Sequence, residues 1–266
     1  MRELIRGIQK TSLVDYPGEV CTTLFVGGCN LRCPWCHNSD LVLRQRQLPR
    51  FQPKAILSSL EKRKHLVPAV CITGGEPTLW TQLPDFIREL KAMELKVKLD
   101  TNGTNPEVLQ GLLTEQLLDY VAMDVKAPPE KYELLTGRPS FMATASTHRV
   151  EPADCLCLGQ NAQETGAAIL KRIQQSIDLI KTSSIDYEFR TTAVPGMLEE
   201  ADLLAIGSWL AQSIRPRRWV LQQFRPATTI IDPCLREAHP YPQEVLERVA
   251  TQMAPYFEEV KVRGEE

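Results

Sequence analysis

Apolar, β-branched runs of strand length alternate along the chain with amphipathic stretches of helix length. The strand-length runs are Val20–Val26, Ala69–Thr73, Lys96–Leu99, Tyr120–Val125, Tyr187–Val194 and Trp219–Gln223. The amphipathic stretches are Lys54–Lys64, Leu83–Met93, Pro106–Leu118, Ala167–Thr182, Glu199–Ser213 and Gln243–Met253. This alternation predicts six βα units around a parallel sheet. Six units are fewer than the eight of a closed barrel, so we predict an α/β fold, a partial (β/α)6 TIM-like barrel that is open on one side.

One segment breaks this rhythm. Residues 139–165 read PSFMATASTHRVEPADCLCLGQNAQET, a mostly polar and small-residue stretch with no sustained hydrophobic period. We predict that this segment is a surface insertion between the fourth unit and its helix. The rest of the chain shows no internal repeat and no second domain, so we expect residues 1–266 to form a single domain.

Composition narrows the class of protein. The chain has 266 residues, of which 43% are hydrophobic, enough for a sizeable core. Its 31 basic and 33 acidic residues nearly cancel, so we expect no nucleic-acid and no membrane partner. The opening MRELIRGIQK lacks the apolar stretch of a secretory signal, and no apolar run approaches the ~20 residues of a spanning helix. We therefore expect a cytoplasmic protein, in which clustered cysteines indicate metal or redox chemistry.

Three cysteines stand together directly after the first predicted strand. Cys29, Cys33 and Cys36 fall within eight residues, and a tight loop can turn their sulfurs toward one soft metal centre. A cubane iron–sulfur cluster held by three cysteines keeps one iron open for a substrate or cofactor. Structural zinc would need a fourth ligand, and His37 is a poor one because it adjoins Cys36. A simple electron-transfer cluster would need a fourth cysteine, which no nearby position supplies.

The spacing of these cysteines resembles a known superfamily. Cys29-x3-Cys33-x2-Cys36, with aromatic Trp35 before the third cysteine, is similar to the signature of the radical S-adenosylmethionine (SAM) superfamily. The resemblance implies a [4Fe-4S] cluster on these three cysteines, whose fourth iron chelates the amino and carboxylate groups of SAM. It also implies that the reduced cluster cleaves SAM into methionine and a 5′-deoxyadenosyl radical, and that Trp35 lies at the cofactor site.

A glycine-rich motif follows the second predicted strand. Gly74 and Gly75 allow close backbone approach, and the carboxylate of Glu76 can accept hydrogen bonds from an ammonium group. Taken alone, the motif reads equally well as an ordinary glycine turn. Together with Pro77 it resembles the GGEP motif of the superfamily, which implies contact with the amino group of SAM.

Acidic and basic side chains follow the next three predicted strands. Asp100 and Thr101 end the third and Asp124 ends the fourth, where their oxygens could bind a hard cation or sugar hydroxyls. A turn with a salt bridge to Lys126 is the alternative. The pattern resembles glycyl-radical-enzyme activating enzymes, in which the matching residues hold a monovalent cation near SAM. Arg190 on the fifth strand could pair with the SAM carboxylate, with a surface salt bridge as the alternative.

Two further motifs point to the same family. The lead-in Ser12-x2-Asp15-x-Pro17-Gly18 is similar to that of the activating enzymes, and 221–226, LQQFRP, resembles the anaerobic ribonucleoside-triphosphate reductase activating proteins. This resemblance implies an enzyme that takes a hydrogen atom from a glycine Cα of a partner glycyl radical enzyme, most closely an anaerobic ribonucleotide reductase. It also implies an electron donor such as a flavodoxin or ferredoxin.

Other interpretations remain open at this point. A radical SAM enzyme could act on a small molecule or nucleoside, and a non-catalytic iron–sulfur redox module would explain the cysteines but not the other motifs. Cys155 and Cys157 could ligate an auxiliary cluster or be bystanders. Cys21, Cys71 and Cys234 fit core or spare positions.

Overall fold

The computed structural model describes residues 4–132 and 166–264. The insertion predicted at 139–165, with Cys155 and Cys157, lies outside the described residues. Within the described part of the chain, no helix combines the length and the apolar character that crossing a membrane requires.

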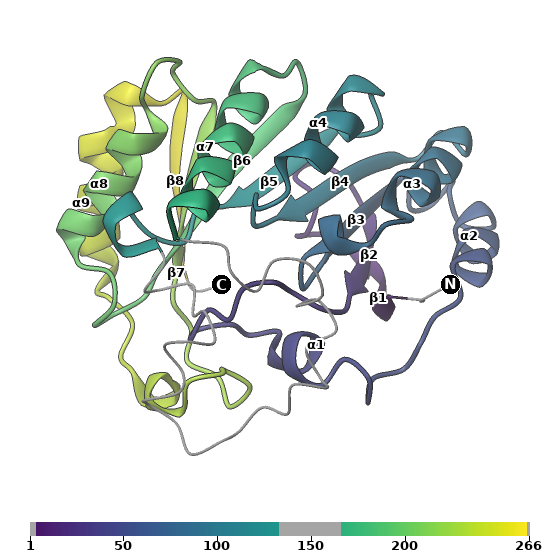
Figure 1. Cartoon of the computed structure of the whole chain (residues 1–266), viewed down its shortest axis with the longest axis horizontal. Coiled ribbons are helices and arrows are strands. Elements are labelled where there is room, and N and C mark those ends of the chain that lie inside the picture. Colours follow the sequence, from purple (N-terminus) through teal and green to yellow (C-terminus); the bar gives the residue numbers. More distant parts are fainter. Residues whose placement is uncertain (1–3, 133–165, 265–266) are drawn as a thin grey trace.

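The described strands form one eight-stranded sheet whose spatial order follows the chain from β1 to β8 (Figure 1). The strands are β1 (Ile5–Ser12), β2 (Cys21–Val26), β3 (Ala69–Gly74), β4 (Lys96–Thr101), β5 (Tyr120–Asp124), β6 (Asp186–Ala193), β7 (Arg218–Gln223) and β8 (Glu259–Arg263). β1 is antiparallel to β2, and every later neighbour pair is parallel. The described part of β1 does not pair with β8, so the sheet is not closed and the predicted partial α/β barrel is confirmed.

The six predicted strands correspond to β2 through β7, and the sequence missed the two edge strands. β1 carries a run of partly or fully exposed polar residues at its end, which hides any alternation. β8 does alternate, with Val260 and Val262 between charged residues, but it is only five residues long. Edge strands pack on fewer neighbours than central ones, so their hydrophobic signal is weaker.

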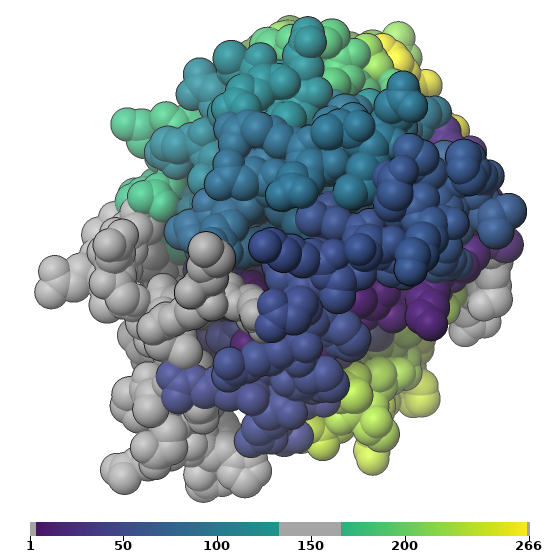
Figure 2. Space-filling view, turned by 90° about the vertical axis from the view of Figure 1, so that its right-hand side faces the viewer, coloured from purple at the N-terminus to yellow at the C-terminus, as the bar shows by residue number. Residues whose placement is uncertain are grey.

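Helices cover the outer face of the sheet as an arc (Figure 1). They are α2 (Pro53–Glu61), α3 (Leu83–Ala92), α4 (Pro106–Thr114), α7 (Gly166–Thr182), α8 (Glu200–Leu210) and α9 (Gln243–Met253). The short α1 (Ser39–Leu43) lies apart from this arc (Figure 1). Short 3-10 turns are η1 (Pro77–Leu79), η2 (Pro129–Lys131), η4 (Pro233–Glu237) and η5 (Ala254–Tyr256). Figure 2 shows the side of the molecule where the blue surface of α1 and α2 adjoins the teal surface of α3 and α4. The long predicted helices are therefore all present.

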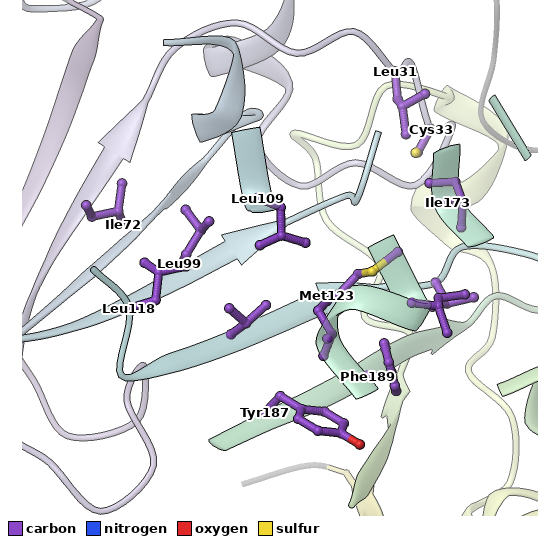
Figure 3. Close-up of a cluster of buried hydrophobic side chains, with 14 of the residues drawn as sticks. Leu31, Cys33, Ile72, Leu99, Leu109, Leu118, Met123, Ile173, Tyr187 and Phe189 are labelled. Atoms are coloured by element: carbon purple, nitrogen blue, oxygen red, sulfur yellow. The ribbon is translucent and has the colours of Figure 1, made fainter. Parts of the chain in front are cut away.

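The two faces of the sheet differ in chemistry. Side chains alternate along a strand, so Val97 and Leu99 of β4 pack under the helices while Lys98 and Asp100 face the hollow of the barrel. Figure 3 shows Leu99 within the outer apolar cluster. On the inner face, the Tyr16 ring lies tilted against the Tyr120 ring, with centroids 5.7 Å apart, and both belong to a small separate cluster. The inner face thus leaves room for polar groups at the carboxyl ends of the strands.

Candidate active site

The cysteine loop leaves β2 and is anchored on both sides. Cys33 and Leu31 are buried at one end of the apolar cluster (Figure 3), and Trp35 is buried in the same core. The Gly28 backbone N–H donates to the Leu41 carbonyl at 2.8 Å, which ties the loop to α1. Contacts within the protein therefore hold the loop in place in the metal-free chain.

The three thiols of this loop influence one another. Burial raises the pKa of the Cys33 thiol to about 11, although the nearby Lys126 ammonium opposes this. Burial likewise raises the pKa of Cys29 and Cys36, and the neighbouring thiols add to the shift at Cys29. The metal-free protein therefore holds neutral thiols at neutral pH. Metal binding would release their protons, as it does in other thiolate sites.

These donors fit a cluster better than a single ion. In residues 4–132 and 166–264, no three His, Cys, Asp or Glu side chains group closely enough to hold one metal ion. In a cubane each thiolate ligates a different iron, so the sulfurs stand further apart than the ligands of one ion. The His37 ring packs edge-on against Phe224, with centroids 6.5 Å apart, rather than completing a zinc site. The chemistry of the donor set, one buried and two half-buried soft thiols on one loop, fits the predicted [4Fe-4S] cluster.

The other described cysteines lie outside the cysteine loop. Cys21 and Cys71 are buried on the inner face of the sheet, and Cys234 is exposed in η4. All six cysteines of the described residues are free thiols. No disulfide therefore forms among the described residues, and the core or spare positions predicted for these three cysteines match the structure.

The glycine motif after β3 lies directly on the cysteine loop. Gly74 has φ +119°, and a Cβ there would come within 2.5 Å of the Val26 backbone. A Cβ on Gly75 would come within 2.0 Å of the Gly28 carbonyl oxygen. Only glycine fits these two positions, because any side chain would push the two loops apart. The predicted close backbone approach is thus between β3 and the cysteine loop.

Glu76 is fully buried, and its carboxylate is occupied by the protein. Oε1 accepts hydrogen bonds from the Thr78 backbone N–H at 3.1 Å, the Thr78 hydroxyl at 2.5 Å and the Thr101 hydroxyl at 2.7 Å. Oε2 accepts one from the Asn102 backbone N–H at 2.7 Å. Burial raises the pKa of this carboxyl, although the four donors work against that rise. The sequence linked this carboxylate to the amino group of SAM. In the structure it joins the glycine motif and η1, which begins at Pro77, to the end of β4.

Five charged side chains alternate in sign across β4, β6 and β5, and we call them the ion-pair chain. Lys98 pairs with Asp100, whose second oxygen lies 3.2 Å from a terminal nitrogen of Arg190. The Arg190 Nε lies 3.0 Å from Asp124, whose other oxygen lies 2.9 Å from the Lys126 ammonium. All four oxygens of the two aspartates thus have a cationic partner.

The ion-pair chain keeps its members charged. Burial alone would raise the pKa of Asp100 and Asp124, but the Arg190 guanidinium and the two lysines outweigh it and lower both values. Both aspartates are therefore ionised at neutral pH, and they compensate the part-buried cations. Carboxylates on adjacent strand ends repel one another unless a positive group intervenes, and here protein side chains provide it.

The structure joins some predicted residues and separates others. Arg190 contacts both Asp100 and Asp124, and the salt bridge between Asp124 and Lys126 that the sequence offered as an alternative is present. The Thr101 hydroxyl instead donates to Glu76 and so belongs to a different network. The predicted cation ligands thus divide between the ion-pair chain and the Glu76 network.

Sequence reasoning gave no role to several residues of this site. Lys98 stands two positions before Asp100, and that spacing places both on one face of a strand, so a signal was present. Asn102 directly follows Thr101 at the end of β4, but its amide partner Asn30 is 72 positions away in sequence. No local pattern predicts such a contact.

Comparisons with known proteins agree with the cysteine motif. The model of the radical SAM superfamily matches residues 23–150. A Methanocaldococcus jannaschii protein named "putative glycyl-radical enzyme activating enzyme" is 32% identical over 227 residues, covering 85% of this chain and 82% of that protein. A Pyrococcus horikoshii protein named "probable GTP 3',8-cyclase" is 32% identical over 129 residues, but covers only 47% of this chain and 41% of that protein.

A solved structure shares the fold. SuiB of Streptococcus suis, crystallised with bound S-adenosylmethionine, has a TM-score of 0.59 at 12% identity. The match covers 90% of this chain, although the chain spans only 48% of SuiB. At this identity the likeness shows only a common fold, which extends over nearly the whole of this chain.

Proposed function

The chain belongs to the radical SAM superfamily, and we propose that it is a glycyl-radical-enzyme activating enzyme whose partner is an anaerobic ribonucleoside-triphosphate reductase. The superfamily implies SAM and a [4Fe-4S] cluster as cofactors. The observation that carries the proposal is the extent of the match to the M. jannaschii protein, which covers 85% of this chain, whereas the cyclase match covers 47%. The enzyme would act in a reducing, anaerobic cytoplasm.

In this proposal the cysteine loop holds the cluster. Cys29, Cys33 and Cys36 would be its ligands, with Trp35 packed behind them. The cluster, when bound, supplies through its open iron the electron that cleaves SAM. The chain's own contribution is a loop fixed by the Gly75–Gly28 contact and by buried Cys33, so that the thiols are held in place before the metal arrives.

The strand ends would bind SAM around this loop. The backbone of Gly74 to Pro77, held rigid by the Glu76 carboxylate, would meet the amino group of SAM. Arg190 would pair with the SAM carboxylate. Arg190 contacts the two aspartates through Nε and one terminal nitrogen, and in this proposal the SAM carboxylate draws the guanidinium away from one of them.

The proposed monovalent cation fits this exchange of partners. When Arg190 turns toward the SAM carboxylate, Asp100 and Asp124 lose part of their compensation. A monovalent cation at Asp100 and Asp124, with Thr101 beside them, would replace it. Binding of the cation and of SAM would then be linked, each strengthening the other.

A protein segment is the proposed substrate. A backbone glycine lets a reactive group approach its Cα closely because no Cβ shields it. The unclosed sheet provides a side from which such a segment could reach the carboxyl ends of the strands. The proposed electron donor is a flavodoxin or ferredoxin.

The proposal is tested by looking for the radical on the partner. The anaerobically reconstituted and reduced protein is mixed with SAM and the candidate reductase, and electron paramagnetic resonance is recorded. We expect a doublet glycyl-radical signal that disappears when the glycine of the partner is replaced by alanine. Repeated turnover of a nucleoside or another small molecule with no protein radical would instead support the second candidate, which the partial match to the cyclase favours.

The cluster ligands are tested separately. Cys29→Ala, Cys33→Ala and Cys36→Ala should each abolish both the cluster and SAM cleavage. Cys234→Ala is the control, because this exposed thiol lies outside the three-cysteine motif, although the turn that carries it contacts the cysteine loop through the hydrogen bond from the Asp232 N–H to the Pro34 carbonyl. This variant should keep about four irons per chain. Cys155→Ala and Cys157→Ala should also leave the cluster intact. About eight irons per chain in the unmodified protein would contradict the single-cluster proposal.

A further inference from the structure

A side-chain amide from the turn after β4 reaches the sulfur of the first cysteine. The Asn102 Nδ2 lies 3.7 Å from the Cys29 Sγ, within hydrogen-bond range for sulfur, and 3.0 Å from the Asn30 Oδ1. The backbone N–H of Leu31 lies 3.4 Å from the same sulfur. Cys29 therefore has one donor from its own loop and one from the turn after β4.

The surrounding hydrogen bonds fix the orientation of this amide. The Asn102 Oδ1 accepts from the Thr104 backbone N–H at 3.0 Å and from the Thr104 hydroxyl at 2.6 Å. A backbone N–H can only donate, so the oxygen of the amide must face Thr104 and its NH2 must face Cys29. The orientation of the donor thus follows from the network.

A closed ring of side chains holds the amide in place. Asn30 accepts from Asn102 and donates through its own amide to the Thr104 hydroxyl at 2.8 Å, while that hydroxyl donates back to Asn102. Asn102 is only 5% exposed. Water therefore does not compete freely for its N–H groups, and the amide cannot rotate without breaking several bonds.

We propose that Asn102 is a positioning residue that donates a hydrogen bond to the Cys29 sulfur and raises the reduction potential of the cluster. The inference rests on the proposed function, because it requires Cys29 to be a cluster ligand. One-electron reduction places additional negative charge on the iron and sulfur atoms, and a buried N–H donor stabilises that charge more in the reduced than in the oxidised state. Asn102 therefore makes the cluster easier to reduce.

Two substitutions separate this role from a merely structural one. Asn102→Ala removes the donor together with the contacts to Thr104 and Asn30. Asn102→Asp keeps the shape of the side chain and the oxygen that faces Thr104, but replaces the NH2 group with an acceptor oxygen. Both variants lose the donation to Asn30, and Asn102→Asp keeps only the contacts to Thr104. If Asn102 only supports the loop through Thr104, the Asp variant should resemble the unmodified protein more closely than the Ala variant does.

The donor role predicts the opposite order. We expect Asn102→Ala to lower the equilibrium constant for one-electron reduction about tenfold, which is a shift of about 59 mV to more negative potential for one electron. Asn102→Asp should shift the potential further in the same direction, because it brings an oxygen against the sulfur. The measurement is a redox titration of the reconstituted protein followed by electron paramagnetic resonance, with iron and sulfide counted per chain.

Asn105→Ala is the matched control. Asn105 lies in the same turn after β4, and its amide donates to the Thr78 hydroxyl at 2.8 Å rather than to a cysteine. The variant should keep the potential of the unmodified protein. Asn102 variants that carry a full cluster at an unchanged potential would overturn the inference, and so would loss of the cluster from both, which would assign the ring to holding the loop. Failure of the unmodified protein to bind a cluster would refute the proposed function instead.

Discussion

Buried Glu76 and the aspartate pair Asp100 and Asp124 all lie at the carboxyl ends of the strands, and the protein stabilises the two sets of carboxylates differently. Glu76 is fully buried and surrounded by four neutral donors from Thr78, Thr101 and the Asn102 backbone. Asp100 and Asp124 are part-buried and are held by cations at every oxygen. The first set uses hydrogen bonds without a compensating charge, and the second uses compensating charges.

This difference indicates what each set can do when a ligand arrives. The donors around Glu76 belong to backbone or to short buried hydroxyl side chains, so they cannot leave without unfolding the loop. Lysine and arginine have long stems and can exchange one partner for another. We therefore expect Glu76 to serve the fold and the ion-pair chain to respond to SAM.

Glu76→Ala should give the largest effect on stability. It leaves several buried donors without an acceptor, so the free energy of unfolding of the metal-free protein should fall by about 4 kcal/mol. Urea denaturation measures this fall. Thr101→Val removes one of the four donors and should lower the free energy of unfolding by only about 1 kcal/mol. A Glu76→Ala protein that is as stable as the unmodified one but binds SAM poorly would contradict the structural role.

Arg190→Gln should come next. It leaves Asp100 and Asp124 with one cation each, which we expect to cost about 2 kcal/mol of unfolding free energy in the metal-free protein. It should also weaken SAM binding in the reconstituted protein, measured by anaerobic calorimetry. Arg190→Lys keeps the charge and should lose less stability than Arg190→Gln. Equal losses in both would show that the guanidinium geometry, not its charge, holds the two aspartates.

The pH dependence of stability should distinguish the two sets of carboxylates. The pKa of Asp124 is lowered in the folded state, so its stabilisation is present above the ordinary value of 3.8 and is lost as the pH falls through the folded value. The pKa of Glu76 is raised, so its contribution is present below the ordinary value of 4.5 and is lost as the pH rises through the folded value.

Asp124→Asn should therefore reduce the sensitivity to acid. Between about pH 5 and about pH 3, the variant should lose about 1 kcal/mol less unfolding free energy than the unmodified protein. Glu76→Gln should have the opposite effect and make the loss on acidification steeper. Urea titrations of the metal-free proteins at several pH values supply both slopes, and identical slopes in all three proteins would mean that other groups dominate.

The smallest effect concerns the cation. Replacing potassium by choline at constant ionic strength should weaken SAM binding about threefold, or about 0.7 kcal/mol, because a monovalent ion would compensate the aspartates once Arg190 turns away. Asp100→Asn should remove this difference between the two salts. Equal affinity of the unmodified protein in both salts would show that the lysines of the ion-pair chain are sufficient.

The sequence predicted the frame of this site better than its connections. The spacing of apolar residues along the chain predicted six strands, their helices and the open barrel, because buried faces need apolar side chains. The three cysteines and the paired glycines could be read from spacing. The partners of Glu76 and Arg190 could not, because they depend on which side chains from different strands reach the same point. Thr101 shows this limit, since its hydroxyl turned toward Glu76 rather than toward the aspartate beside it.

The order of the strands has a consequence for how the protein is made. Each strand pairs with the one synthesised just before it, so the sheet can grow on the ribosome without waiting for distant segments. The cysteine loop, Gly75 and the ring of Asn30, Asn102 and Thr104 are all present once β4 and its loop have emerged. Arg190 arrives much later, on β6. The nascent chain therefore completes the loop proposed to hold the cluster before it adds the arginine proposed to bind SAM.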